Sequence, residues 1–289
     1  MQSWHRIICR TCFLWLPTVV LAAASTVAAE KATATLLVKD SLAALHQQAV
    51  VEAKLVTKGL LKDSALGGEP VELVINGVVV ATAMTGGDGR AFLSYVPKAR
   101  GITSIRVRVG NSPRVAASEG QANLVVWERR NPILVVEMAS LMDEELPRGP
   151  LPGLGPKIQP ELKPIPDAAD ELGKLTKFYY GAIYIVPLPP GTDGFEANVE
   201  AREWLKSHGF PPGLVLAIPP GEDALGTTID ELHAAGWKTI KTGIGRSKAF
   251  VEAFLRRRLE AVMVPEPAKG DAPRKAKIAK DWKEVRKKL

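Results

Sequence analysis

The sequence predicts a multidomain protein in which an all-β sandwich precedes an α/β domain with a mostly parallel sheet. Residues 30–128 hold short apolar stretches separated by glycine-rich turns, which is typical of an antiparallel sandwich. Over residues 131–265, apolar strands alternate with segments of helical period, which indicates parallel βα units. A chain of 289 residues is long enough for two ordinary domains.

Residues 1–29 have the features of a secretory signal peptide. Arg6 and Arg10 precede an apolar run that Pro17 interrupts and that is too short to span a bilayer comfortably. Small residues at positions 27–29 offer a cleavage site. We therefore expect an exported protein, periplasmic or extracellular, with an uncleaved N-terminal anchor as the alternative.

The distribution of cysteine and charge limits the chemistry that the chain can perform. Both cysteines, Cys9 and Cys12, lie in the predicted signal peptide, so the remainder offers no disulfide and no thiolate for zinc. The tail, residues 266–289, holds nine Lys/Arg and four Asp/Glu, and the body before it is near neutral. A neutral body argues against a nucleic-acid partner. The basic tail either packs as a terminal helix or contacts an anionic membrane surface.

Turn signals support the sandwich. Asn76-Gly77 lies between two apolar stretches, and both positions of such a hairpin turn favour positive φ. Asp88, within a glycine-rich stretch, is expected to be a turn residue rather than a calcium ligand. The predicted strands are Ala34–Val38, Ala49–Thr57, Val71–Ile75, Val78–Met84, Ala91–Val96, Ser104–Val109 and Ala122–Trp127.

The amino-acid sequence of this first domain resembles that of bacterial immunoglobulin-like modules. The resemblance is carried by the stretch Gly68-Glu-Pro-Val-Glu-Leu-Val-Ile-Asn-Gly77 and by Thr85-Gly-Gly-Asp-Gly-Arg-Ala-Phe-Leu-Ser-Tyr-Val-Pro97. It covers roughly residues 32–128. Such modules serve as spacers or binding platforms, so the resemblance implies binding rather than catalysis for this domain.

The second domain begins with the apolar stretch that ends at Glu137. A proline-rich segment, residues 146–166, is unsuited to a helix or a central strand, and Asp167 after it is a candidate helix cap. The predicted strands are Ile133–Glu137, Ala182–Val186, Leu214–Ile218, Trp237–Thr242 and Ala261–Val264, and the predicted helices are Asp167–Lys177, Gly194–His208, Ala224–Ala235 and Arg246–Arg257.

The stretch Ala201-Arg-Glu-Trp-Leu-Lys-Ser-His-Gly-Phe-Pro-Pro-Gly-Leu-Val-Leu216, continued by Leu225-Gly226 and Ala234-Ala-Gly-Trp237, resembles a known family. The similarity is to the haloacid-dehalogenase-like (HAD) phosphohydrolases, in their lipin-like and phosphatidate-phosphatase branch. The resemblance implies a Rossmann-like α/β fold. In active members it also implies a nucleophilic aspartate, a second aspartate as acid and base, a Ser/Thr and a Lys that hold phosphoryl oxygens, and a late acid for Mg²⁺.

The positions that match these motifs carry unsuitable residues. Glu137 stands at the nucleophile and Ala139 at the acid/base. Val186 has no hydroxyl for phosphate, residues 224–228 include no lysine, and Lys248 stands near the Mg²⁺ acid. The resemblance therefore implies a degenerate, non-catalytic pseudophosphatase domain that needs no cofactor and has a binding or scaffolding role. Its partner is expected to be a protein, an anionic lipid or a phosphate ligand.

Two hypotheses concern the degenerate site. Glu137 and Lys248 are predicted to form an ion pair in which the ammonium group takes the place of Mg²⁺. Alternatively, the start of the helix after residue 245 binds a phosphate or lipid head group, with a structural turn as the competing interpretation of its Gly-x-Gly pattern. The candidate anion-binding residues are Gly243, Gly245, Arg246 and Ser247.

An active enzyme remains the alternative function. Glu137 and the acids at residues 143–145 would then serve an atypical Mg²⁺-dependent phosphatase, and Mg²⁺ would be its cofactor. His208 and His233 are also available, although both are expected to have structural roles at or within helices.

Overall fold

The structure is a computed structural model that describes residues 31–57, 59, 63–143, 162–188, 191–268 and 270–289. The predicted signal peptide and most of the proline-rich segment lie outside these residues. Lys31–Leu289 forms one compact unit.

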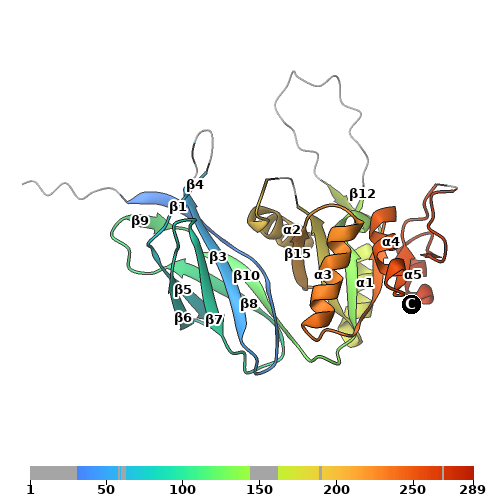
Figure 1. Ribbon diagram of the computed structural model, residues 1–289, viewed down its shortest axis with the longest axis horizontal. Helices are drawn as coiled ribbons and strands as arrows, with labels where there is room; N and C mark the ends of the chain where they lie inside the picture. Colours follow the sequence, from blue (N-terminus) through green and yellow to red (C-terminus); the bar gives the residue numbers. More distant parts are fainter. Residues whose placement is uncertain (1–30, 58, 60–62, 144–161, 189–190, 269) are drawn as a thin grey trace, which may run out of the picture. The chain divides into compact units, whose positions relative to one another are not determined.

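Strands fill the first part of this unit (Figure 1). They pair into two sheets, of order β4-β3-β1-β9, with β7 also paired to β3, and β2-β10-β8-β5-β6. The strands are β1 (Ala32–Val38), β2 (Ser41–Ala44), β3 (Ala49–Thr57), β4 (Ser64–Ala65), β5 (Pro70–Ile75), β6 (Val78–Met84), β7 (Arg90–Tyr95), β8 (Gly101–Val109), β9 (Val115–Ala117) and β10 (Gly120–Trp127).

The pairing pattern is that of an immunoglobulin-like sandwich, as predicted. One sheet contains the order β10-β8-β5, and β1 and β2 divide the first strand between the two sheets. The core between the sheets is apolar, because inward side chains such as Leu36, Leu55, Leu93 and Ile105 are almost fully buried. The sequence did not indicate β2 or β9.

The turn predictions hold in detail. Asn76 and Gly77 have φ of 51° and 81°, which matches the expected hairpin between β5 and β6. Asp88 accepts a hydrogen bond from the Arg90 amide at 3.1 Å, so its carboxylate stabilises its own turn.

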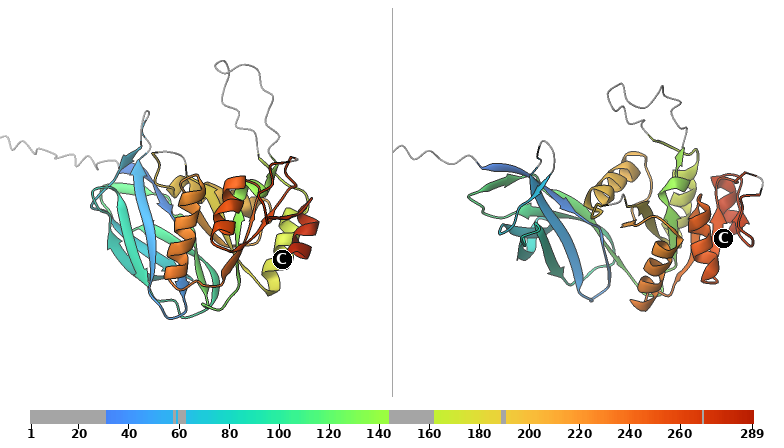
Figure 2. Two further views of the ribbon diagram at one scale, coloured as in Figure 1. Left: turned by 45° about the vertical axis from the view of Figure 1, so that its right-hand side comes forward. Right: turned by 45° about the horizontal axis from the view of Figure 1, so that its top comes forward.

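The second part is a parallel sheet with helices on both faces (Figures 1 and 2). Its order is β15-β14-β11-β16-β17-β18, and every pair in it is parallel. The elements are β11 (Ile133–Glu137), a 3-10 turn (Met138–Ser140), β12 (Met142–Asp143), β13 (Lys163–Pro164), α1 (Ala168–Phe178), β14 (Gly181–Pro187), α2 (Phe195–Ser207), β15 (Leu214–Ile218), α3 (Glu222–Ala234), β16 (Ile240–Gly245), α4 (Lys248–Arg256), β17 (Glu260–Met263), β18 (Lys277–Ile278) and α5 (Trp282–Lys288).

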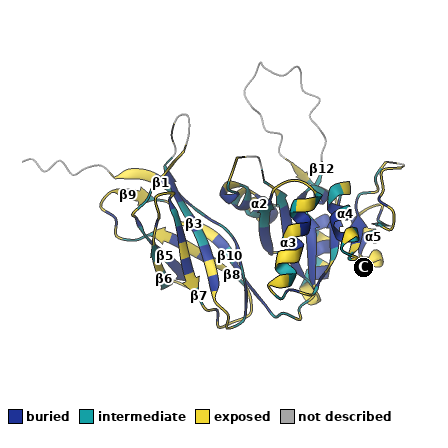
Figure 3. Ribbon diagram, in the orientation of Figure 1, coloured by how far each residue is buried: buried dark blue, intermediate teal, exposed yellow. Residues whose placement is uncertain are grey.

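This order is that of a doubly wound parallel sheet, and the direction of strand addition reverses between β11 and β16. α3 and α4 pack on one face of the sheet, and α1, α2 and α5 on the other. The strands are buried and the helices expose their outer sides (Figure 3). An α/β domain with a mostly parallel sheet is therefore confirmed.

Two predictions in this part need correction. The strand expected from Trp237 begins at Ile240, because Trp237 is a buried core residue of the preceding turn. Asp167 precedes α1 but has a φ of 63° and makes no side-chain capping bond; its carboxylate pairs instead with Lys283 at 3.0 Å. The tail does pack as a terminal helix, because Trp282 is fully buried.

Asp40, in the turn between β1 and β2, ties the sandwich to the α/β domain. Its carboxylate is fully buried and accepts hydrogen bonds from the Asn123 and Val215 amides at 2.8 and 3.1 Å. The Arg202 guanidinium of α2 donates to it at 2.8 Å. Burial raises the pKa of Asp40 above its ordinary value, against the opposing effects of Arg202 and the two amides.

A second contact joins the same two parts at the start of α2. Phe195 is fully buried beneath the Lys39 ammonium, which lies 4.3 Å from the ring centroid. Asp193 accepts from Lys54 at 2.5 Å and from Arg90 at 3.4 Å. Partial burial acts to raise the pKa of Asp193, but the hydrogen bond and charge of Lys54, together with the Phe195 amide and the charge of Arg90, outweigh it and hold that pKa below its ordinary value.

Candidate functional site

The candidate site lies at the carboxyl ends of β11 and β16. In open α/β sheets, ligands bind where the strand order reverses, outside the carboxyl ends of the strands. Glu137 is the last residue of β11, and Gly245 is the last residue of the neighbouring β16. The sheet thus brings Glu137 close to the start of α4, although the two segments are about a hundred residues apart in sequence.

Glu137 is bound to the start of α4 through both of its carboxylate oxygens. Oε2 accepts hydrogen bonds from the amides of Arg246 at 2.6 Å and Ser247 at 2.8 Å. Oε1 accepts from the Ser247 hydroxyl at 2.5 Å. Free amides at a helix start attract an anion, and here a carboxylate of the same chain takes that place.

Local sequence explains why α4 begins at this point. Ser247 has an extended backbone, and its hydroxyl oxygen accepts a hydrogen bond from the Phe250 amide at 3.2 Å. Gly243 and Gly245 lie under aromatic rings, since a side chain at these positions would collide with Phe254 and Phe250 respectively. The Gly-x-Gly pattern therefore serves close packing between β16 and α4, which is the structural interpretation of this motif.

Arg246 is directed to the turn after β11. Its guanidinium Nη1 donates to the carbonyl of Met142 at 3.1 Å and approaches that of Ala139 at 3.5 Å. The four residues proposed for anion binding therefore lie together, and the amides and the hydroxyl among them bind Glu137. An external anion at this position would have to displace that carboxylate.

The predicted ion pair between Glu137 and Lys248 is wrong. In the described part of the chain, Lys248 pairs with a carboxylate of its own helix, where Nζ lies 3.9 Å from Glu252 Oε1, and its side chain is 61% exposed. The backbone amides and hydroxyl of the α4 cap face the end of β11, and the ammonium group faces solvent. Both the amides at the start of α4 and the Lys248 ammonium group attract a carboxylate, and the sequence alone could not show which of them Glu137 meets.

The chain's last helix supports the turn that carries Ala139. The Ser140 hydroxyl donates to the Glu137 carbonyl at 2.7 Å, and the Trp282 indole donates to the Ser140 carbonyl at 2.8 Å. This hydrogen bond from Trp282 holds the 3-10 turn (Met138–Ser140) in place. The helical spacing of Trp282 and Val285 predicted packing, but nothing in the sequence placed the indole under the candidate site.

The remaining candidates have structural partners or lie outside the site. A ring nitrogen of His208 lies 2.9 Å from the Trp204 carbonyl, and one of His233 lies 2.9 Å from the Ile240 carbonyl. Val186 is half-buried in β14, and Asp143 is exposed. The acids at 144 and 145 fall outside the described residues. Within the described residues, no three His, Cys, Asp or Glu side chains gather as a metal site would require.

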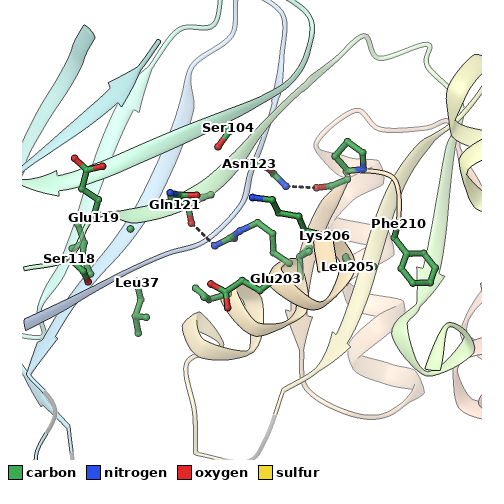
Figure 4. A pocket seen from close by; sticks show the side chains of 18 of the residues that line it. Leu37, Ser104, Ser118, Glu119, Gln121, Asn123, Glu203, Leu205, Lys206 and Phe210 are labelled. Atoms are coloured by element: carbon green, nitrogen blue, oxygen red, sulfur yellow. Dashed lines mark hydrogen bonds between the residues drawn. The ribbon is translucent and has the colours of Figure 1, made fainter. Parts of the chain in front are cut away.

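A separate pocket of about 680 Å³ lies where α2 faces the sandwich (Figure 4). Arg202 crosses it to the Gln121 carbonyl, and the exposed Glu203 and Lys206 of α2 lie on its wall with Glu119 of the sandwich. Sequence patterns did not reveal this pocket, because its lining comes from segments of both domains.

No family model matches the chain, and no curated protein matches it. Among solved structures, the chain is similar to a 282-residue C-terminal fragment of intimin, solved with the intimin-binding domain of its translocated receptor. That match has 12% identity, 37% coverage of this chain, 34% of that chain and a TM-score of 0.24. Domains 4 and 5 of the S-layer protein SbsC match at 16% identity, with 32% and 44% coverage and a TM-score of 0.20.

The multi-modular, cell-surface-expressed chitinase ChiW of Paenibacillus sp. str. FPU-7 matches at 11% identity over 88% of this chain and 24% of that chain, with a TM-score of 0.25. The chain spans less than half of each of these three solved chains. The description of the fold therefore rests on its own strand order.

In the described part of the chain, no helix has the length and apolar character that crossing a bilayer requires.

Proposed function

We propose that this protein is an exported, non-catalytic relative of the HAD-like phosphohydrolases that acts by binding or scaffolding. One observation carries the proposal: the carboxylate at the nucleophile position is held by the start of α4. Both Glu137 oxygens accept short hydrogen bonds from Arg246 and Ser247.

A nucleophilic carboxylate needs an oxygen free to approach phosphorus within about 3–3.5 Å and in line with the leaving group. Glu137 would have to leave the cap of α4 before it could attack. The acid/base position offers only the methyl group of Ala139, which transfers no proton. The hydrocarbon side chain of Val186 gives a phosphoryl oxygen no hydrogen bond.

The test combines calorimetric titration of Mg²⁺ with an aryl-phosphate turnover assay on one sample. The expected result is neither Mg²⁺ binding nor turnover, in the parent protein and in Glu137→Gln alike. The matched control is Glu252→Gln. It removes a carboxylate from α4 but leaves the bonds between Glu137 and the start of α4 unchanged.

Mg²⁺-dependent turnover that is lost in Glu137→Gln and kept in Glu252→Gln would overturn the proposal. It would establish the alternative, a Mg²⁺-dependent phosphatase with an atypical glutamate.

A further inference from the structure

We infer that the end of α1, together with the end of α5, docks the protein on an anionic membrane surface. Two aromatic side chains at the end of α1 are highly exposed. Phe178 and Tyr179 are each 72% exposed, more than any other large hydrophobic side chain in the described part of the chain. Exposed rings side by side at a helix end are unusual in a soluble surface and indicate contact with a partner or a lipid interface.

The ends of the two helices carry basic residues next to these rings in the sequence or on the packed partner helix. We call the following residues the α1–α5 patch: Lys174, Lys177, Phe178, Tyr179, Lys287 and Lys288. The Lys177 ammonium lies 5.2 Å from the centroid of the Phe178 ring. α1 packs against α5, and Leu289 contacts the same apolar cluster as Leu175 of α1. The left view of Figure 2 shows α5, at the C-terminus, next to α1, with which it is in contact.

Charge is divided along this helix pair. The acidic residues of α1 and α5 lie at their starts, where Asp170, Glu171 and Glu284 occupy the first turns. The last turns of both helices carry basic residues and no acidic residue. Lys174 is paired with Glu171 at 2.7 Å, so the positive charge of the patch is carried mainly by Lys177, Lys287 and Lys288.

A cation of the sandwich extends the same surface. A cavity lined by Thr176, Lys177 and Tyr180 is also lined by Arg100 and Glu128, which places the loop between β7 and β8 next to the end of α1. Glu128 pairs with both Arg100 and Arg130, so the two positive charges exceed the one negative charge of this carboxylate.

These features fit a lipid surface better than a protein groove. The rings stand outside the cavity beside them, and the apolar side of α5 is already used, since Trp282 and Val285 are buried. Contact would thus be shallow: Phe178 and Tyr179 reach the head-group level, and long lysine side chains meet anionic head groups. The inference goes beyond the proposed function and does not depend on it.

The test uses Lys31–Leu289, because this range forms a compact unit and excludes the apolar leader, which would bind lipid by itself. The unit is mixed with phosphatidylcholine vesicles, with and without phosphatidylglycerol, and bound protein is measured by flotation. We expect binding only to the anionic vesicles. Binding should fall as salt rises from about 0.1 to about 1 M, which shortens the Debye length from about 10 to about 3 Å.

Two variants of the patch sharpen the result. Phe178→Ser/Tyr179→Ser should lower the partition coefficient about tenfold or more, because it removes both interfacial rings. Lys287→Gln/Lys288→Gln should lower it about thirtyfold at low salt. The matched control is Val78→Ser/Met84→Ser, which removes similarly exposed apolar side chains from β6 of the sandwich and should bind as the parent does.

Three results would overturn the inference: binding of the parent unit to neither kind of vesicle, equal binding of the parent unit to neutral vesicles, or binding of the patch variants equal to that of the control. Retention of the parent on polyglutamate beads without vesicle binding would also overturn it, and would point to an acidic protein as the occupant.

Discussion

Replacement of Asp40 by alanine should lower the free energy of unfolding by about 3–5 kcal/mol, the range for breaking a buried ion pair. The structure explains the size. The side chain of Asp40 is fully buried, and the change leaves the buried amide of Val215 and the part-buried amide of Asn123 without their acceptor. Arg202, only 13% exposed, loses its carboxylate and keeps the neutral acceptors Asn198 and Gln121.

Urea unfolding, followed by tryptophan fluorescence, measures this difference, and thermal unfolding should show a fall in Tm of roughly 10 °C. Asp230→Ala is the matched control. Asp230 also pairs with an arginine, Arg257, at 2.6 Å, but its side chain is 59% exposed, so its loss should cost less than about 1 kcal/mol. Equal effects of the two changes, or a loss below about 1 kcal/mol for Asp40→Ala, would refute the claim that burial makes this contact important.

Three further predictions follow from burial and packing. Because burial raises the folded pKa of Asp40 above its unfolded value near 3.8, ionisation of this carboxyl group costs more in the folded state than in the unfolded state. This protonation-dependent part of the stability is complete below that value and is lost as pH rises through the folded pKa. The stability of the parent relative to Asp40→Asn should therefore decline as pH rises above about 3.8, and urea titrations that show no decline would contradict this. Trp282→Ala should cost about 3–5 kcal/mol in the same assay, since the side chain is fully buried and bonded; a cost below about 1 kcal/mol would mean that the tail is dispensable. Gly245→Ala should cost about 1–3 kcal/mol because the new methyl group collides with Phe250, whereas Gly87→Ala, in open space, should be nearly neutral; similar unfolding midpoints for the two would count against the packing role.

Local patterns were sufficient for most of the fold. β3 and β6 have the predicted bounds, and β15 does also, because alternating or continuous apolar stretches and turn residues identify such strands. The short β2, β9 and β18 carry no such signal. These strands form because β10, β1 and β17, respectively, supply their hydrogen-bond partners. Such pairing depends on the tertiary structure and cannot be seen in a local sequence pattern.

The candidate site was predictable in position but not in geometry. The end of β11 and the turn after β16 were expected to matter, and the sheet does bring Glu137 to Ser247. The partner of Glu137 was assigned to the wrong group, because a sequence shows the charge of Lys248 but not the direction of backbone amides. The support from Trp282 and the anchoring role of Asp40 depend on contacts across more than a hundred residues, which no local pattern encodes.

The bonds between Glu137 and α4 also fix the length of side chain that this position accepts. An aspartate here would be shorter by one methylene and would withdraw its oxygens from the amides of Arg246 and Ser247. The start of α4 would then lose the anion that its free amides bind. Residue 137 is therefore constrained through the stability of a helix about a hundred residues away in the sequence, whatever ligand or partner the protein binds.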